Sequence, residues 1–344
     1  MAARLPLKPN RELIVGVGSA LVDILTHEDE AFLEQTGAAK GGMTYVEKEF
    51  IEEILSRSST TPRIVPGGSA CNTVVGVGRL GGKARFVGKC GNGDWGRLFH
   101  EDLRRQNVEP ALVGSDSPTG RVLSIITPDA QRSMFTYLGA SSETRPADLS
   151  NGCFENAAIV HIEGYLLFNP ELMLAALSAA RQAGALVSLD LASYTVVQES
   201  RSLLDRIITE QVDIVIANED EARAFTGFDD EQKSLGILAE KAALAVIKLG
   251  ERGSLIAHRG RTVSVEPLGS GRAVDTTGAG DLWAAGFLYG LVNGYPLERC
   301  GLIGSACGYE VCQVIGAAIP AEGWQRIKKM IGESQNGHQK ESLA

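Results

Sequence analysis

The stretch Asp275–Asp281, with the sequence Asp-Thr-Thr-Gly-Ala-Gly-Asp, combines a glycine-rich turn, a helix start and an acidic side chain. Gly278 and Gly280 permit a tight turn with exposed amides, and the apolar run 282–291 predicts a helix whose positive end faces that turn. Phosphate would bind there. Because a carboxylate does not itself hold phosphate, we assign Asp281 the task of accepting a proton from an attacking hydroxyl. Taken alone, Asp281 would equally suit a first-turn residue that complements the helix dipole.

A second glycine-rich element lies far upstream, at residues 66–73 (Pro-Gly-Gly-Ser-Ala-Cys-Asn-Thr). Gly67 and Gly68 would let backbone amides approach substrate hydroxyls, and Asn72 offers both a donor and an acceptor. The alternative is a plain turn with Ser69 as N-cap and Asn72 facing solvent. Together the two elements resemble the ribokinase (PfkB) family of small-molecule kinases, which carries Gly-Gly-x-x-x-Asn in its first half and Asp-Thr-x-Gly-Ala-Gly-Asp near its end. The resemblance covers roughly residues 12–325.

The resemblance implies a ribokinase-like α/β fold, a three-layer αβα sandwich with a mostly parallel central sheet and a small β lid, in one kinase domain over residues 1–344. Alternating strand and helix patterns agree with it. Short apolar runs predict strands buried on both faces at residues 13–17, 158–162, 185–189, 213–217 and 244–249. Helices are predicted at residues 94–105, 171–183 and 280–292. Because ligands collect at the carboxyl ends of parallel strands, the motifs are expected to meet in one crevice.

Two excursions, at about residues 36–65 and 118–140, interrupt this alternation. The second contains a hairpin signal, with extended runs at 122–127 and 132–138 around a turn. Since family members carry a small β lid, we expect both excursions to form a lid whose closure excludes water. Ordinary surface hairpins are the alternative. Arg132 in the second excursion could reach a phosphate or remain a solvated charge, and the polar tail 333–344 is predicted to be disordered.

Five residues are candidates for binding the acceptor substrate: Asp23, Gly67, Gly68, Asn72 and Glu163. Asp23 follows the first predicted strand, where the family's substrate-binding aspartate falls, and a carboxylate suits vicinal hydroxyls. Glu163 ends the strand at 158–162 and lines up with a substrate-contacting position of ribokinase-like enzymes. Without the resemblance, Asp23 would be interpreted as a turn or cap residue and Glu163 as a solvated strand end.

The resemblance places nucleotide and metal ligands in the second half of the chain. Asn218 and Glu221 match the family's Asn-x-x-Glu element near Mg²⁺ and the nucleotide phosphates, where Glu221 would act largely through water. Helix capping is the alternative, because the same spacing is typical of a helix start. The candidate ATP-binding residues are Asn218, Lys248, Gly250, Gly253 and Thr276. Asp275 and Thr277 are candidates for a K⁺ site completed by carbonyls at residues 311–316.

Composition narrows the class of partner. The 344 residues are 44% hydrophobic, enough for a large core, and the formal charge is −9. Without a basic block, this charge argues against a nucleic acid or an anionic membrane as partner. We expect a cytoplasmic protein, since no signal peptide or membrane span is recognised. Six cysteines without zinc spacing should be reduced and mostly buried, and a monomer or homodimer acting on a small molecule is expected.

The combined features predict an ATP-dependent kinase acting on a primary hydroxyl by in-line transfer. Asp281 would be the general base, while the amides of Gly278, Ala279 and Gly280 stabilise charge on the phosphate. Segments 32–33, 43–46 and 133–138 resemble the adenosine-kinase branch, so the expected acceptor is a nucleoside. The chain departs from that branch at Ser19, where the branch usually has Asn. A free-sugar kinase, ribokinase- or fructokinase-like, is the alternative. A catalytically inactive nucleotide-binding homologue is the second alternative.

Overall fold

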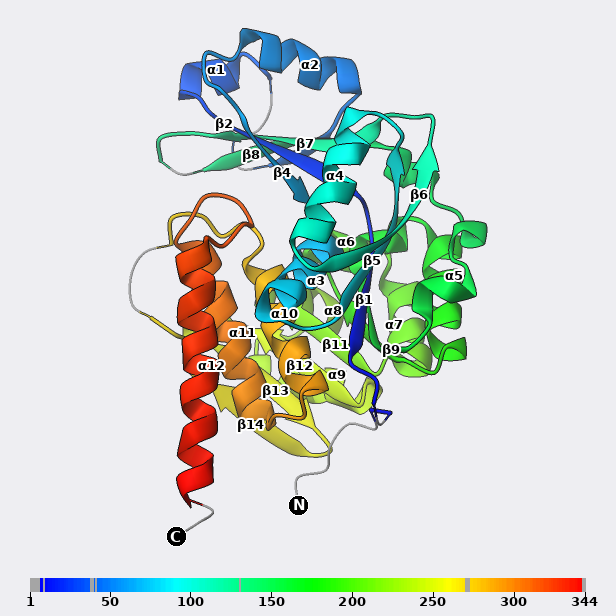
Figure 1. The fold of residues 1–344 in the computed structure, drawn as a ribbon, viewed down its shortest axis with the longest axis vertical. Helices are drawn as coiled ribbons and strands as arrows, with labels where there is room; N and C mark the ends of the chain where they lie inside the picture. Colours follow the sequence, from blue (N-terminus) through cyan, green and yellow to red (C-terminus); the bar gives the residue numbers. More distant parts are fainter. Residues whose placement is uncertain are drawn as a thin grey trace.

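Two β-sheets organise the chain in a computed structural model that describes residues 7–341 apart from 9, 38, 39, 41, 130 and 270–272 (Figure 1). In spatial order, the strands of the larger sheet are β14 (Arg261–Val265), β13 (Ser254–His258), β12 (Leu244–Lys248), β11 (Ile214–Asn218), β10 (Leu186–Asp190), β9 (Ala157–Glu163), β1 (Leu13–Val17), β5 (Ala84–Gly91) and β6 (Val108–Ser115). Those of the smaller sheet are β3 (Met43–Tyr45), β8 (Arg132–Gly139), β7 (Thr119–Ile126), β2 (Leu21–His27) and β4 (Arg63–Gly67).

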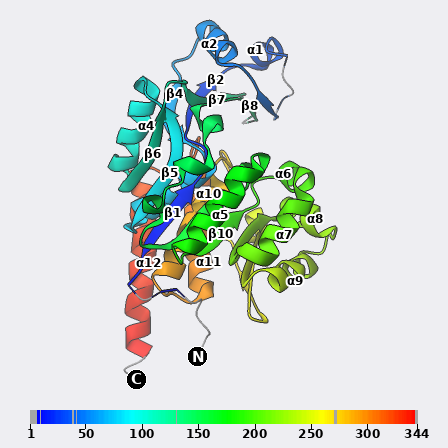
Figure 2. The ribbon, with the colours of Figure 1, turned by 90° about the vertical axis from the view of Figure 1, so that its right-hand side faces the viewer.

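The larger sheet is parallel from β12 to β6, and β13 and β14 extend it antiparallel. Its central strands are apolar along their length because helices cover both faces. The five predicted strands are confirmed, each shifted by no more than about two residues. Their carboxyl ends all lie at one edge of the sheet, on the side of the smaller sheet (Figure 2).

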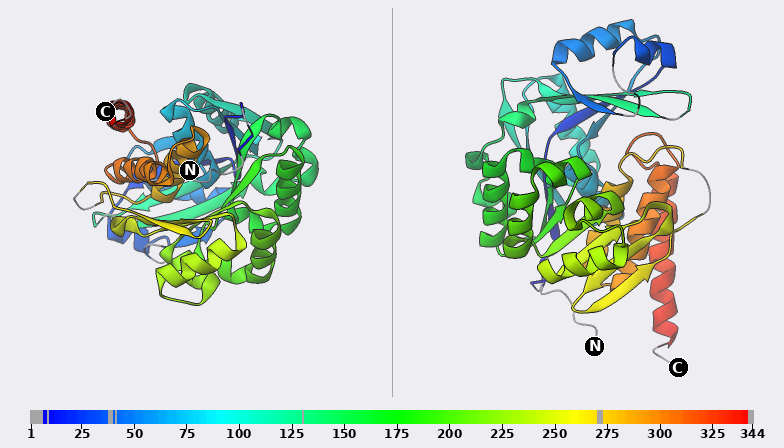
Figure 3. Two further views of the ribbon diagram at one scale, coloured as in Figure 1. Left: turned by 90° about the horizontal axis from the view of Figure 1, so that it is seen from below. Right: turned by 180° about the vertical axis from the view of Figure 1, so that it is seen from behind.

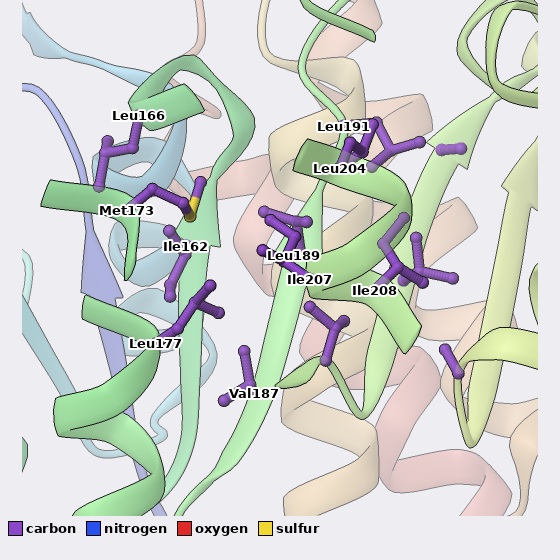
Figure 4. Close-up of a cluster of buried hydrophobic side chains, with 14 of the residues drawn as sticks. Ile162, Leu166, Met173, Leu177, Val187, Leu189, Leu191, Leu204, Ile207 and Ile208 are labelled. Carbon is purple, nitrogen blue, oxygen red and sulfur yellow. The ribbon is translucent and has the colours of Figure 1, made fainter. Parts of the chain in front are cut away.

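Five helices cover one face of the larger sheet: α5 (Pro170–Gln182), α6 (Tyr194–Glu199), α7 (Arg201–Gln211), α8 (Glu219–Thr226) and α9 (Glu231–Lys241). Figure 4 shows part of this layer, where Met173 and Leu177 of α5 pack on Ile162 of β9. Leu189 of β10 and Ile207 of α7 continue the same apolar layer. Burying such side chains contributes about 1.5–3 kcal/mol each, which makes this layer a rigid support for the strand ends.

The opposite face carries α3 (Ser69–Leu80), α4 (Asp94–Arg105), α10 (Ala279–Val292) and α11 (Leu297–Cys312). Helices α3 and α10 pack so closely that a Cβ on Gly76 would lie 2.5 Å from the Cβ of Ala285. Helix α12 (Ala321–Glu341) packs its first half on this layer through Trp324 and Ile327. The α3–α10 contact joins the two glycine-rich elements of the sequence.

The smaller sheet lies beyond the carboxyl ends of the larger one, with α1 (Glu30–Glu34) and α2 (Lys48–Arg57) on its outer side (Figures 1 and 3). It has a core cluster of its own, which includes Ile24, Ile51, Leu123 and Phe135. The predicted hairpin corresponds to β7 and β8. The first excursion begins earlier than predicted, because β2 belongs to this sheet and starts at Leu21. We call the smaller sheet with α1 and α2 the lid.

Two further expectations can be compared with the structure. Helix α12 extends to Glu341 and so includes most of the segment predicted as a disordered tail; residues 342–344 lie outside the described part. The six cysteines form no disulfide, and four of them are buried. Among the described residues, no helix is both long and apolar enough to cross a membrane.

The described part of the chain also contains five short 3₁₀ helices: η1 (Ala140–Glu143), η2 (Pro146–Asp148), η3 (Asn151–Phe154), η4 (Gly164–Phe168) and η5 (Gly250–Arg252).

Candidate active site

Asp281 lies in the first turn of α10, where the two glycine-rich elements meet. Its Oδ1 accepts a 2.7 Å hydrogen bond from Ser69 Oγ, and its Oδ2 accepts a 3.0 Å bond from Asn72 Nδ2. Thr73 Oγ1 donates to the Asp281 carbonyl at 3.1 Å. Gly278 caps the helix at φ 71°, in the left-handed region that glycine enters without strain. One face of α3 therefore orients a carboxylate at the positive end of α10.

The charge state of Asp281 is set by opposing effects. Burial raises its pKa above the ordinary value, whereas the hydrogen bonds from Asn72 and Ser69 lower it. Such a carboxylate is a better proton acceptor than an exposed aspartate and is still held in its ionised form by two donors. The arrangement suits a general base.

None of the three contacts on Asp281 was predicted from the sequence. Asn72 was assigned to the substrate, yet its side chain is buried and its amide binds Asp281; Ser69 was weighed only as an N-cap, a position that Gly68 occupies. A usable signal existed, because residues 69, 72 and 73 have the i, i+3, i+4 spacing of one helix face. What that face contacts was not visible in the sequence.

Asp23 follows the first strand, β1, in the chain and lies within strand β2 of the lid, so it is not the turn or cap residue that was the alternative. Its carboxylate occupies the space beside Gly67, where any Cβ would overlap it. Burial raises the pKa of Asp23 to about 7; Arg132 opposes this rise and Asp281 adds to it. Asp23 and Asp281 thus approach each other from the lid and from α10.

Glu163 ends β9 and is only 2% exposed. Its Oε1 accepts from the Ser19 amide at 2.8 Å, and its Oε2 accepts from the Ala70 amide at 3.1 Å. Burial raises its pKa to about 7, although these two amide bonds favour the charged form. The structure therefore places Glu163 beneath the site, where it joins the chain leading into the lid to the start of α3.

A cavity of about 930 Å³ opens beside the first turn of α10. All five candidate ATP-binding residues lie on its wall, together with Ala279 and Gly280. Sequence reasoning missed other wall residues, including Trp283, Ser305, Tyr309 and Gln313. Those four come from α10, α11 and the segment after it, and only the helix packing brings them to the cavity.

Asn218 and Glu221 form a reciprocal capping box at the start of α8. The Asn218 backbone and side-chain nitrogens donate to the two Glu221 oxygens, each at 2.8 Å, and the Glu221 amide donates to Asn218 Oδ1 at 2.8 Å. Burial raises the pKa of Glu221 to about 7, and nearby Asp190 adds to that rise. Capping accounts for these contacts, and the buried carboxylate also lies where added positive charge would be favourable.

Lys248 and Asp190 form a buried ion pair at the carboxyl ends of β12 and β10. The Lys248 Nζ to Asp190 Oδ2 distance is 2.8 Å. Burial opposes both charges, yet their attraction outweighs it: the pKa of Asp190 is lowered and that of Lys248 is raised. Asp190 was not predicted as a site residue.

Asp275 connects the turn before α10 to two other segments. Its carboxylate accepts from the Thr277 amide at 2.9 Å and from the Gly316 amide at 2.8 Å, and it faces Arg132 of the lid at 3.7 Å. Burial opposes ionisation, but the hydrogen bonds from Thr277 and Gly316 outweigh it and keep the pKa of Asp275 low. Hydrogen-bond donors and a guanidinium thus surround this carboxylate, and the K⁺ site at Asp275 and Thr277 stays a prediction.

A second cavity, of about 360 Å³, lies under the lid. Tyr45, Thr136, Tyr137, Leu138 and Glu143 are among the residues on its wall. The Tyr45 side chain is exposed, and the Thr136 hydroxyl is buried without a hydrogen-bond partner among the described residues. The wall thus offers an aromatic face at Tyr45.

The fold and the site together define a phosphotransferase that acts on a hydroxyl of a small molecule. A buried carboxylate, a glycine-rich turn at a helix start and a cavity of about 930 Å³ lie together at the carboxyl edge of the sheet, an arrangement that suits this class. The pfkB family carbohydrate kinase profile matches residues 38–324. The chain belongs to this family and has its ribokinase-like fold, with a sugar or nucleoside hydroxyl as acceptor.

Solved structures and curated relatives agree on the family and differ in substrate. A probable sugar kinase from Rhizobium etli CFN 42 is 34% identical, with a TM-score of 0.85 over 94% of this chain and 99% of that one. Adenosine kinase from Sinorhizobium meliloti is 32% identical, with a TM-score of 0.84 over 93% and 99%. The 5-dehydro-2-deoxygluconokinase of Geobacillus kaustophilus (strain HTA426) is 28% identical over 79% of this chain and 86% of its own.

Proposed function

We propose that the protein is an ATP-dependent nucleoside kinase that phosphorylates a primary hydroxyl, with Asp281 as general base. The observation that carries the kinase mechanism is the Asp281 carboxylate, held by Ser69 and Asn72 at the anion-binding end of α10. An acceptor hydroxyl beside this carboxylate would lose its proton to Asp281 as its oxygen attacks the γ-phosphorus of ATP. The amides at Gly278, Ala279 and Gly280 would stabilise charge on the transferred group.

The acceptor would lie between Asp23 of the lid and Asp281. Asp23 would accept hydrogen bonds from ribose hydroxyls, and the bare backbone at Gly67 leaves room for the Asp23 carboxylate itself. The cavity under the lid favours a nucleoside, because Tyr45 and Tyr137 offer aromatic faces for a planar base.

The donor set on the nucleotide side fits Mg²⁺. Glu221 would hold it through water, and because burial raises the pKa of this carboxyl to about 7, a cation bound nearby would favour its charged form. When bound with ATP, Mg²⁺ neutralises phosphate charge. The described residues contain no group of three or more His, Cys, Asp or Glu side chains suited to a metal, which agrees with binding shared among one carboxylate, waters and phosphates.

A free-sugar kinase is the second candidate. The 28% identity to 5-dehydro-2-deoxygluconokinase over most of both chains favours it, and the Asp281 mechanism applies equally to a sugar hydroxyl. The two candidates differ only in what fills the cavity under the lid.

The test is ADP release from ATP and Mg²⁺ across a panel of nucleosides, free sugars and sugar acids. Asp281→Asn is compared with Asp94→Asn, which removes a first-turn carboxylate from another helix, α4. We expect turnover with a nucleoside, and phosphorus NMR should identify the product as a phosphate ester of its primary hydroxyl. The kcat should fall about a thousandfold or more for Asp281→Asn and stay unchanged for Asp94→Asn. Turnover with sugars alone would show that the acceptor is a sugar and not a nucleoside. Equal effects of the two variants on kcat would reject Asp281 as the base. If no compound of the panel causes ADP release, the remaining interpretation is the inactive nucleotide-binding homologue.

A further inference from the structure

The buried pair of Lys248 and Asp190 needs a reason beyond stability. Its side chains are 13% and 8% exposed, so both charges have left water. A buried ion pair adds little net stability, because desolvation offsets the attraction. The pair lies on strands that flank β11, at the edge of the sheet where the nucleotide cavity opens.

The Lys248 ammonium lies against the anion-binding turn. A Cβ built on Gly280 would be 2.9 Å from Lys248 Nζ, so the ammonium fills the space beside the first turn of α10. Among the described residues on the cavity wall, the other basic side chain is Arg252, which is more than half exposed and pairs with Glu231. Within that described part of the wall, Lys248 is therefore the buried cation.

Asp190 is itself held rigidly. Its second oxygen, Oδ1, accepts from the Ala192 amide at 2.9 Å. Ala192 adopts a left-handed φ of 65°, which costs a residue other than glycine about 1–2 kcal/mol. Both oxygens of the carboxylate are thus committed, one to a strained loop and one to Lys248.

We propose that Asp190 is a positioning residue that holds the Lys248 ammonium beside Gly280, where it neutralises charge on the phosphoryl group during transfer. The proposal rests on the kinase function above and adds a residue to its machinery. Glu221 and Asp281 also attract Lys248. Without Asp190 the ammonium would turn toward these carboxylates, and pairing with Asp281 would make the base a weaker proton acceptor.

A double-mutant cycle tests the proposal, with Asp190→Asn, Lys248→Met and the two combined. Asn at 190 keeps an acceptor for the Ala192 amide and removes the charge. We expect Lys248→Met to lower kcat about a hundredfold and Asp190→Asn to lower it about tenfold, with the KM for the acceptor unchanged. The double variant should be no slower than Lys248→Met, because Asp190 acts through Lys248. The double variant buries no unpaired charge, so it should fold even if Asp190→Asn does not.

Glu310→Gln is the matched control. Glu310 is also 8% exposed and pairs with Arg326 at 2.6 Å, between α11 and α12. It should lower the melting temperature and leave kcat as in the parent. If Asp190→Asn behaves like this control, or if the effects of Asp190→Asn and Lys248→Met multiply, the positioning role is wrong.

Nucleotide binding separates this inference from the proposed function. The affinities for ATP and ADP are measured by calorimetry without acceptor. Lys248→Met and Asp190→Asn should weaken the binding of ATP more than the binding of ADP. A parent protein that binds ATP and phosphorylates nothing would defeat the proposed function and still decide the role of Asp190. An unchanged ATP-to-ADP ratio in both variants would overturn the inference.

Discussion

The α3–α10 contact and the lid contribute to the same site and differ in how they are held. The helix pair lies within the main core, with Phe287 and Ala285 fully buried and bare glycine at the contact. The lid has a separate small core, and its β3 strand is exposed along its length. The difference indicates that Asp281 is fixed in place by packing, whereas the lid can change position as a unit.

The largest effect should separate the two cores. Phe287 stacks on Trp283 in the main core, and Phe135 packs on Phe50 in the lid. Phe287→Ala should lower the free energy of unfolding of the whole protein by about 3–5 kcal/mol. Phe135→Ala should instead speed amide hydrogen exchange in β7 and β8 and leave the larger sheet protected. Equal loss of protection in both sheets would show that lid and main core unfold together.

The next effect concerns Glu163, which joins the lid's entry segment to α3. Its pKa is 4.5 when exposed and about 7 when folded, so the folded state binds this proton more tightly. The resulting stability is fully present below pH 4.5 and is lost as pH rises through about 7, amounting to about 3 kcal/mol. Urea unfolding across this range should show the decline, and Glu163→Gln should reduce it. A profile of the same slope in the variant would exclude Glu163 as the cause.

A smaller effect is expected from Ser69→Ala, which removes one of two hydrogen bonds on Asp281. The kcat should fall about tenfold, because the base loses a fixed orientation. The Ser69 bond lowers the pKa of Asp281, so its loss should move the acid limb of kcat/KM to higher pH. Ser234→Ala, at a buried helical serine in α9, is the control. An unmoved acid limb would mean that Asp281 does not set the pH profile.

The smallest effect should come from Arg132, which faces Asp275 across 3.7 Å and lies near Asp23. A pair at this distance contributes about 1 kcal/mol or less, so Arg132→Ala should raise the KM for the acceptor up to about fivefold. Arg132→Lys should recover part of the loss. A fall in kcat as large as that of Ser69→Ala would instead place Arg132 on the transferred phosphate.

Prediction from sequence worked where local pattern decides structure. The buried strands follow from short apolar runs, and the helix from Ala279 follows from an apolar run behind Gly278. It did not reach contacts whose partners come from elsewhere in the chain: the lid strand that holds Asp23 was not predicted, because its pairing with β4 and β7 is non-local. The hydrogen bond from Asn72 to Asp281 was not predicted for the same reason, since the two residues are 209 positions apart.

The sequence by itself determined the anion-binding turn and the carboxylate at its end, because glycine and first-turn preferences act within a few residues. Only the tertiary structure decided which side chains hold that carboxylate, since Ser69 and Asp281 are 212 residues apart. It likewise brought Asp190 and Lys248 together from strands that are not adjacent in the sheet. Glu221 shows the boundary between the two: its spacing from Asn218 specified a capping box, whereas burial in the folded protein, with a smaller contribution from Asp190, raises its pKa.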